Sequence, residues 1–367
     1  MNNKNRGLQG FLSIILSFSL LSVTLFFSGD LVSFMTDFTL GAFTVMTGVN
    51  EFKRENSKNT SGAENEISGF GNSFVVDSNS ADTKTPEDIE KLMDEAVSAY
   101  ASFKKTGKIE ETQLLATSST TSYGNVIVNN KTETKKVNIK KELSKTASFG
   151  KITKDEPYIL VYHTHTTEGY ELLDKGWYSD EYVSRTKELD KTVVRVGDEI
   201  VERLEKAGFK VIHDKTIHDA SYDGAYSRSL KTVEKILKEN PSIVITLDIH
   251  RDAIEYSSGT KCKPTVTING KKAAQVMIIT GAEEGDIKDY PDWSKNLTFA
   301  IALQNKVEEN YKGLMRPIFF CQRRYNMHVT PCSLLLEMGT DANTLEEAVY
   351  SGRLIGDSLA ELLEENM

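Results

Sequence analysis

Two histidines and a glutamate follow directly after an apolar run in the first half of the chain. The run covers residues 158–162, and His163, His165 and Glu168 come within six residues of its end. A continuous apolar run of this length is typical of a buried strand in an α/β sheet. Side chains at the carboxyl end of such a strand project into the crevice where these sheets bind ligands. Taken alone, the cluster is either a divalent-metal site or a strand end that carries histidines by chance.

Two later apolar runs carry polar groups of the same kind. Residues 243–249 lead into His250, Arg251 and Asp252, and Glu337 lies inside the apolar run 333–339. A carboxylate within such a run is costly to bury unless it is paired or functional. Because neighbouring parallel strands present their carboxyl ends at one edge of a sheet, we expect these groups to face one crevice.

The residue types predict a zinc-dependent hydrolytic site. Two imidazoles and a carboxylate with one open position form the pattern of catalytic zinc, so His165, Glu168 and His250 are the predicted ligands. Zinc lowers the pKa of its bound water to about 7. An apolar setting raises the pKa of a carboxyl group, which suits Glu337 to the transfer of a proton in catalysis.

Three further residues are candidates for supporting roles. His163 points to the same face as His165, so it is an alternative ligand, a support for the ligands or a substrate contact. Arg251 and Asp252 either hold the imidazole of His250, bind a substrate carboxylate or form a plain ion pair.

The motifs resemble those of the stage II sporulation protein P family, which belongs with the zinc-dependent N-acetylmuramoyl-L-alanine amidases. The resemblance covers about residues 155–367 and rests on the order of the motifs and the elements between them. The residues that carry it are His163-Thr-His-Thr-Thr-Glu168, Asp248-Ile-His-Arg-Asp252, Leu336-Glu-Met-Gly339 and Asn343-Thr-Leu-Glu-Glu347.

The resemblance implies a peptidoglycan hydrolase of endospore-forming bacteria. It would cut the amide between N-acetylmuramic acid and L-Ala of the stem peptide during engulfment. The family is also associated with cleavage of peptide cross-links and with a partner, stage II sporulation protein D. In the wider amidase family the second metal ligand lies at the start of the following helix, here near Glu188 or Asp190. Glu168 is favoured because it lies beside the histidines, and the alternative stays open.

Two other functions remain open at this stage. Metal-activated water attacks any amide placed before it, so a zinc endopeptidase that acts on stem-peptide cross-links fits the same residues. A non-catalytic scaffold is the third possibility, in which the core binds septal cell wall and residues 85–150 recruit partners. The products of digestion separate the first two, and a variant of Glu337 separates both from the third.

The periodicity of residues 151–367 predicts one α/β catalytic domain with a mixed, mostly parallel sheet and helices on both faces. Strand 158–162, helix 189–204 and strand 209–213 form a βαβ unit. A hairpin is expected over residues 264–280, around the turn signal Asn269-Gly270. The other expected elements are helices 226–238, 294–311 and 344–364 and strand 315–321.

The amino-terminal part predicts a membrane anchor and a tether. Residues 8–29 carry no charge and are numerous enough to cross a hydrocarbon core of about 30 Å. Lys4 and Arg6 precede this run, which places the amino terminus in the cytoplasm and the catalytic domain outside. A cleaved signal peptide is the alternative, although no clear Ala-x-Ala site follows. The resemblance implies the mother-cell side of the septal or engulfing membrane.

Four regions follow from these patterns. Residues 1–49 form the cytoplasmic stub and anchor, and their second apolar stretch, 31–49, is interrupted by Asp37 and either contacts or crosses the membrane. Residues 50–84 are a polar, flexible linker. Residues 85–150 are an accessory helical and irregular segment, in which a helix begins near Thr85. Residues 151–367 are the catalytic domain.

The overall composition narrows the class of partners. The formal net charge of −9 argues against non-specific binding of nucleic acid. The three cysteines form no CxxC pattern, and His328 and Cys332 lack a second pair that would complete a structural zinc site. Nucleic acid is therefore not an expected partner; the uncharged run at residues 8–29 predicts contact with the membrane, and the resemblance implies peptidoglycan and stage II sporulation protein D.

Overall fold

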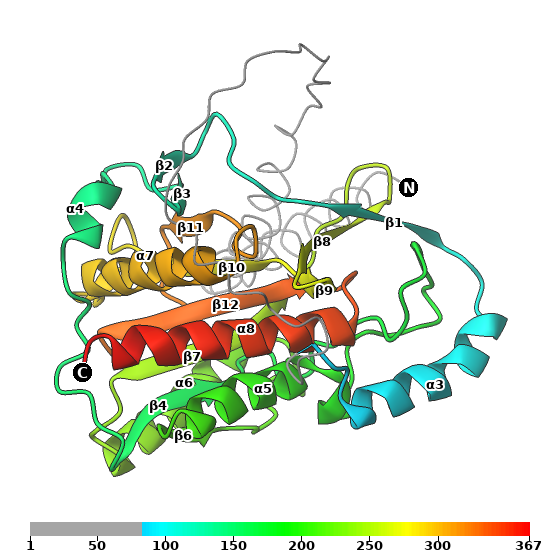
Figure 1. Ribbon diagram of the computed structural model, residues 1–367, viewed down its shortest axis with the longest axis horizontal. Helices are drawn as coiled ribbons and strands as arrows, with labels where there is room; N and C mark the ends of the chain where they lie inside the picture. The colour runs from blue at the N-terminus through cyan, green and yellow to red at the C-terminus, as the bar shows by residue number, and fades with distance from the viewer. Residues whose placement is uncertain (1–82) are drawn as a thin grey trace, which may run out of the picture. The chain divides into compact units, whose positions relative to one another are not determined.

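The computed structural model describes residues 83–367, and an eight-stranded sheet lies at its centre (Figure 1). The strand order is β2-β3-β11-β10-β12-β7-β4-β6. Neighbouring strands are parallel except at β2–β3 and β10–β12. The strands are β2 (Thr121–Tyr123), β3 (Val126–Asn130), β4 (Pro157–Tyr162), β6 (Lys210–His213), β7 (Ile245–Asp252), β10 (Val276–Gly281), β11 (Ile318–Cys321) and β12 (Cys332–Thr340).

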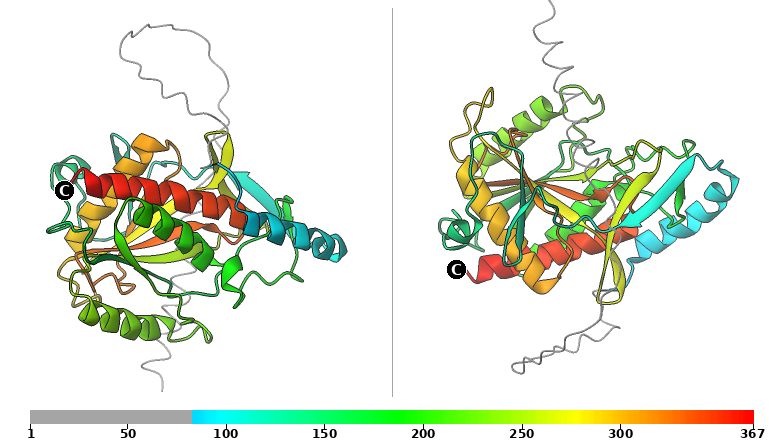
Figure 2. Two further views of the ribbon diagram at one scale, coloured as in Figure 1. Left: turned by 60° about the horizontal axis from the view of Figure 1, so that its bottom comes forward. Right: turned by 90° about the horizontal axis from the view of Figure 1, so that it is seen from above.

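Helices cover both faces of this sheet (Figure 2). One face carries α5 (Val193–Lys206), α7 (Trp293–Asn310) and α8 (Leu345–Glu364), and the other carries α6 (Ala225–Glu239). Strand β4 shows the division, because Ile159 and Val161 join the large core beneath α5 and α8, whereas Leu160 and Tyr162 pack with Val233 of α6. The predicted mixed, mostly parallel sheet with helices on both faces is confirmed.

Local sequence signals account for the ends of the helices that flank the site. The side chain of Thr192 accepts a hydrogen bond from the backbone N–H of Val194 at the start of α5. Thr344 and Glu347 form a reciprocal capping box at the start of α8, as the Ser/Thr-x-x-Glu pattern predicts. Both caps satisfy backbone N–H groups that a helix leaves without partners.

Residues 85–150, which we expected to be an accessory segment, are built into the same sheets as the later residues. β3 pairs in parallel with β11 in the central sheet. β1 (Gly107–Thr112) belongs to a second sheet of order β5-β1-β8-β9. The other new elements are α3 (Glu87–Ser102), α4 (Ile139–Leu143), β5 (Trp177–Tyr178), β8 (Lys261–Ile268) and β9 (Lys271–Ala274). The apolar stripe of α3 is buried in the main core, at Ile89, Leu92, Ala96 and Tyr100.

The hairpin expected over residues 264–280 is correct in its turn and wrong in its second strand. Asn269 and Gly270 both have positive φ angles, and Ile268 pairs with Lys271 across the turn. The partner of β8 is β9, however, while β10 leaves the hairpin and pairs with β12 in the central sheet. Residues 264–281 therefore link the two sheets, which an alternating pattern cannot reveal.

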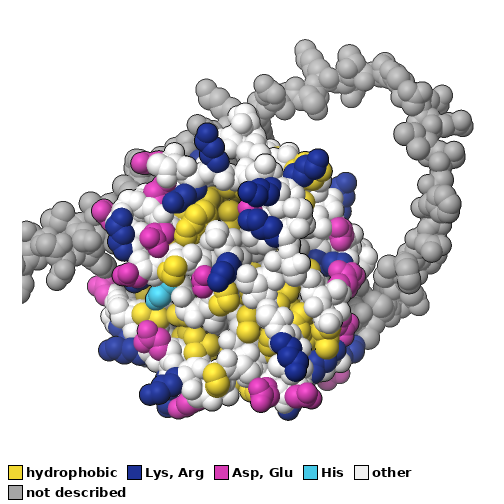
Figure 3. All heavy atoms as spheres, turned by 90° about the vertical axis from the view of Figure 1, so that its left-hand side faces the viewer, with side chains coloured by type: hydrophobic (Ala, Val, Ile, Leu, Met, Phe, Trp, Pro, Cys, Tyr) yellow, Lys and Arg dark blue, Asp and Glu magenta, His cyan; other side chains and the backbone are white. Residues whose placement is uncertain are grey.

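The predicted anchor at residues 8–29, the stretch 31–49 and nearly all of the linker 50–84 lie outside the described residues. Within residues 83–367, no helix combines the length and the apolar character that a membrane span requires. One face of the molecule carries basic and acidic side chains close together, with apolar side chains between them (Figure 3). Charges of both signs partly cancel there, which weakens long-range attraction of a polyanion to this face.

Candidate active site

The carboxyl ends of three adjacent parallel strands meet at one edge of the central sheet. β7 lies between β4 and β12 and pairs in parallel with both. Glu337 of β12 lies opposite His250 of β7, and β4 ends immediately before the segment that carries His165 and Glu168. The structure thus brings the four predicted residues to one edge. One detail differs from the sequence analysis, because β7 continues to Asp252 and His250 lies inside the strand rather than after it.

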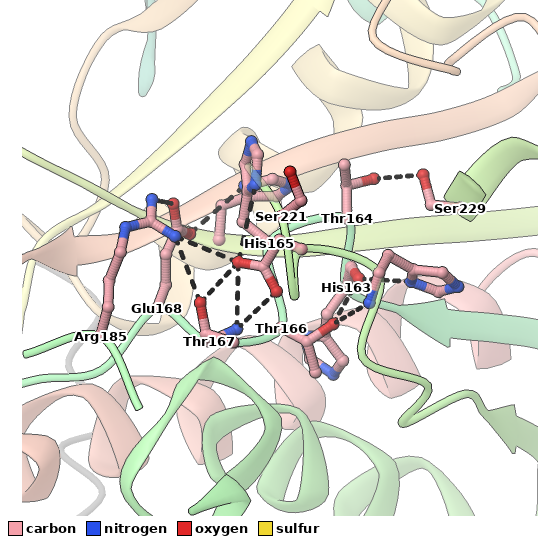
Figure 4. A network of polar contacts seen from close by, with 12 residues as sticks. His163, Thr164, His165, Thr166, Thr167, Glu168, Arg185, Ser221 and Ser229 are labelled. Atoms are coloured by element: carbon pink, nitrogen blue, oxygen red, sulfur yellow. Dashed lines mark hydrogen bonds and ion pairs between the residues drawn. The ribbon is translucent and has the colours of Figure 1, made fainter. Parts of the chain in front are cut away.

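Glu168 is a buried carboxylate that faces His250. Its Oε2 lies 3.4 Å from Nδ1 of His250 and accepts the backbone N–H of Arg251 at 3.1 Å. Its Oε1 accepts from Nη2 of Arg185 at 3.1 Å (Figure 4). Burial alone would raise the pKa of Glu168, but the hydrogen bond and charge of His250 outweigh it and lower that pKa well below its usual range. Glu168 is therefore held as an anion.

His250 lies between two carboxylates. Besides Glu168, it faces Asp248, whose Oδ1 is 2.9 Å from Nε2 of His250. Asp248 is itself fixed by the backbone N–H and the hydroxyl of Thr164, at 2.8 and 2.7 Å. Burial works against the charged imidazole, but Asp248 and Glu168 raise the pKa of His250 well above its usual value. The two acids thus create a strong preference for positive charge at this position.

His165 is held by aromatic rings. It stacks on Tyr222 with centroids 4.7 Å apart and the planes 2° from parallel. The rings of Tyr226 and His250 meet it nearly at right angles, at 5.5 and 5.3 Å. Its Nδ1 is buried and has no hydrogen-bond partner among the described residues, and Oδ2 of Asp219 lies 3.8 Å away. Burial lowers the pKa of His165 to about 4, so the ring is a neutral nitrogen donor.

Glu337 differs from Glu168 in its ionisation. Burial and the nearby charge of Asp252 raise the pKa of Glu337 to about 8. Its Oε2 is buried and has no hydrogen-bond partner among residues 83–367. Two carboxyl groups at one edge of the sheet therefore have pKa values displaced in opposite directions, an arrangement that assigns different roles to them.

The alternative ligands considered from the sequence lie elsewhere. His163 is fully buried, with Nδ1 3.0 Å from the carbonyl of Ile249 and Nε2 2.9 Å from Nε2 of His213, so both of its nitrogens are engaged. Burial and the neighbouring His213 lower the pKa of His163 to about 3. Glu188 is exposed and pairs with Lys191. The residues that the structure places beside one another are thus His165, Glu168 and His250.

Arg251 and Asp252 have separate partners. Arg251 donates from Nε to the carbonyl of Gly169 at 2.9 Å, which ties β7 to the segment after β4. The carboxylate of Asp252 accepts from Nη1 of Arg316 at 3.0 Å. Asp252 thus forms a plain ion pair with Arg316, which was one of the alternatives, whereas the guanidinium of Arg251 contacts a backbone carbonyl.

The donor types fit a divalent metal, although their atoms are not gathered around one point. Among residues 83–367, one set of three acidic side chains has possible metal-ligand atoms within 4.8 Å of one another. These residues are Glu111, Asp174 and Glu347. These three surround the ammonium of Lys263. His165, Glu168 and His250 are less closely drawn together. However, the ring of His165 is neutral and Glu168 is held as an anion, and a neutral imidazole and a carboxylate are donors that zinc takes in proteins.

Sequence reasoning missed four residues of this site. Asp248 stands within a quoted motif and received no role, although its spacing from His250 places both on one face of β7. Arg185, Asp219 and Tyr222 lie on irregular segments, where no periodicity shows which residues turn inward. Only the folded loop brings Asp219 and Tyr222 to His165.

Comparison with known proteins identifies the family. Residues 57–360 match the family model described as stage II sporulation protein P. The chain belongs to this family. The resemblance stated from the sequence motifs is therefore confirmed. Stage II sporulation protein P of Bacillus subtilis (strain 168) is 30% identical over 222 residues, which are 57% of this chain and 52% of that relative. The chain thus spans about half the length of this relative.

Solved structures give a weaker likeness. The CwlD amidase from Clostridioides difficile, solved in complex with the GerS lipoprotein, is 14% identical with a TM-score of 0.36 and covers 57% of this chain and 99% of that chain. The catalytic domain of CwlV, an N-acetylmuramoyl-L-alanine amidase from Bacillus (Paenibacillus) polymyxa var. colistinus, is 14% identical with a TM-score of 0.33. The match covers 57% of this chain and 97% of that chain. N-acetylmuramoyl-L-alanine amidase AmiC2 of Nostoc punctiforme is 11% identical with a TM-score of 0.33. The match covers 57% of this chain and 96% of that chain.

Proposed function

We propose that this protein is a zinc-dependent peptidoglycan hydrolase that cleaves the amide between N-acetylmuramic acid and L-Ala of the stem peptide. One observation carries the hydrolytic part of the proposal. At the edge of the sheet that carries His165, Glu168 and His250, Oε2 of Glu337 is a buried polar atom without a hydrogen-bond partner among the described residues. Such atoms are costly to bury in a purely structural site. The choice of bond rests on the membership of the family.

His165, Glu168 and His250 would hold the metal. Bound there, zinc supplies an acidified water and polarises the amide carbonyl. Glu168 brings a fixed negative charge, and the neutral ring of His165 brings a nitrogen lone pair. Asp248 orients the ring of His250 from the side opposite Glu168.

Glu337 transfers the proton from the attacking water to the leaving group. With a pKa of about 8, its carboxylate form is a stronger base than an ordinary carboxylate, and the charge of a bound metal would favour that form. It accepts the proton of the attacking water and returns it to the nitrogen of the departing L-Ala. Half-exposed Tyr222 and partly exposed Arg185 reach from this centre to the surface, where the muramyl peptide would enter.

The membrane and the partner protein belong to the same proposal. An uncleaved anchor at residues 8–29 would hold the catalytic domain outside the cytoplasmic membrane, close to its insoluble substrate. By membership of the family, the enzyme would act in septal wall degradation during engulfment, on the mother-cell side, together with stage II sporulation protein D.

The test is analysis of the products released from purified sacculi by the full chain in detergent. Mass spectrometry is expected to find intact stem peptides that begin with L-Ala, and these products are expected to disappear after treatment with a chelator and to return with zinc. Glu337→Gln is the matched control, since it keeps the size of the side chain and removes the acid. A fragment that begins at residue 151 is unsuitable because it lacks β3 of the central sheet.

An endopeptidase would give different products. Muramic acid would keep its peptide, and shortened or separated stem peptides would appear. Release of no free stem peptide by the zinc-loaded protein would refute the amidase proposal. Equal effects of the parent and Glu337→Gln on the wall in cells would favour the non-catalytic scaffold.

A further inference from the structure

Asp219 is a buried carboxylate beside the predicted metal ligand His165. It lies on the loop between β6 and α6, and its side chain is 0% exposed. Its Oδ2 accepts hydrogen bonds from the hydroxyl of Thr167 at 2.6 Å and from Nη1 of Arg185 at 3.1 Å, and its Oδ1 accepts the backbone N–H of Thr167 at 3.1 Å. Both partner residues are labelled in Figure 4. Three donors thus hold this carboxylate in one place.

His165 lacks the partner that the other buried histidines of this region have. Nδ1 of His163 lies 3.0 Å from the carbonyl of Ile249, and Nδ1 of His218 lies 3.0 Å from the carbonyl of His163. By contrast, Nδ1 of His165 is buried without a hydrogen-bond partner among the described residues. The carboxylate of Asp219, at 3.8 Å, lies near this nitrogen.

A metal-ligating histidine usually donates its second ring N–H to a carboxylate, a carbonyl or a water. This second contact fixes the tautomer and the orientation of the ring. The three rings of Tyr222, Tyr226 and His250 leave His165 little freedom to turn away from Asp219. A shift of about 1 Å would bring the two atoms to hydrogen-bond distance.

We infer that Asp219 is a positioning residue that accepts a hydrogen bond from Nδ1 of His165 when the metal is bound. His165 then presents Nε2 to the metal. The inference rests on the proposed function, because it takes His165 as a metal ligand. It adds a residue from outside the three strand ends, on a loop that also carries Tyr222 across the face of His165. The loop thereby contributes to metal affinity as well as to the wall of the site.

A purely structural role for Asp219 predicts a different result. If the carboxylate only ties its loop to Thr167 and Arg185, its loss lowers the stability of the metal-free protein and leaves metal affinity unchanged. The dissociation constant for zinc separates the two roles, and it is measured by competition with a chromophoric chelator on the metal-free full chain.

The variants are Asp219→Asn, His165→Ala and, as a matched control, Asp214→Asn. Asp214 lies on the same loop, with its carboxylate 3.6 Å from Nε2 of His218, which is not among the predicted ligands. We expect Asp219→Asn to weaken zinc binding about 10–100-fold, since supporting residues of ligating histidines have effects of this size. We expect Asp214→Asn to leave the affinity unchanged.

Zinc affinity of folded Asp219→Asn equal to that of the parent would overturn the inference, provided that His165→Ala binds zinc less tightly. Failure of the parent itself to bind zinc would instead overturn the metal chemistry of the proposed function, and the inference with it. If Asp219→Asn does not fold, Thr167→Val decides the question, because it removes one of the donors that hold Asp219. A smaller loss of zinc affinity is expected there, and no loss would refute the inference.

Discussion

The substitution Lys263→Met tests how α8 is tied to the second sheet, because Lys263 lies on β8 and Glu347 on α8. Lys263 is 1% exposed, and its ammonium lies 2.9 Å from Glu347, 2.8 Å from Asp174 and 2.9 Å from Glu111. Burial disfavours its charge, but these acids, Glu347 foremost, outweigh burial and raise the pKa of Lys263. Removal of one partner of a buried ion pair costs about 3–5 kcal/mol, because the other charge stays behind.

The lower end of that range is expected here. Glu347 keeps the hydrogen bonds from Asn343 and from the backbone N–H of Thr344, and the other two acids are partly exposed. A loss of about 3 kcal/mol corresponds to a fall in Tm of about 6–12 °C for a domain of this size. Thermal unfolding followed by circular dichroism measures this shift.

Lys272→Met is the matched control. Lys272 contacts the same Glu111 and Asp174, at 2.7 and 2.9 Å, but its side chain is 46% exposed. An exposed pair contributes about 0–1 kcal/mol, so the Tm should fall by no more than about 4 °C. Equal shifts for the two variants would refute the reasoning, because they would show that neither burial nor Glu347 adds to the effect of Lys263.

Three further outcomes are expected. In Gly197→Ala the new Cβ would lie 2.9 Å from Cε1 of His163. Overpacking should cost about 1–3 kcal/mol, more than the gain in helix propensity, so the urea midpoint of unfolding should fall. A higher midpoint would show that the site has room for a methyl group. Tyr100→Phe removes a 3.1 Å hydrogen bond to buried Glu171. The free energy of unfolding should fall by about 1–2 kcal/mol, while its dependence on denaturant concentration stays the same. A urea midpoint equal to that of the parent would show that the bond adds no stability. Glu337→Gln should lower kcat about 10²–10⁴-fold while co-sedimentation with sacculi is retained; full activity would remove Glu337 from the chemistry.

Local patterns predicted the elements that bury a continuous apolar run or an amphipathic stripe. β4, α5 and α8 fall close to their expected positions because their signals lie within one segment. Pairing between distant segments was not predictable in this way. The short strand β3 gives no sign that its partner is β11, and β10 gives no sign that it leaves the hairpin for β12.

The residues of the candidate site were predictable from the sequence only where the signal lies within one segment. Glu337 and His250 were found because each interrupts or ends an apolar run, where a polar residue needs a reason. Asp219 has no such surroundings in the sequence, since it lies in a polar loop where acids are common. Its burial results from Thr167 and Arg185, which reach it from other segments. Residues on loops therefore require the folded structure for their assignment.

The pairing of β3 with β11 also has a consequence for how the chain folds. Val128 pairs with Ile318, so β3 cannot pair with β11 until 190 further residues have been synthesised. Contacts of such long sequence separation require closure of a large loop before they stabilise the chain, which slows folding. Until β11 is synthesised, this edge of β3 has no partner strand and is open to aggregation. A protein with this order of strands therefore benefits from a chaperone that binds the unpaired segment during synthesis.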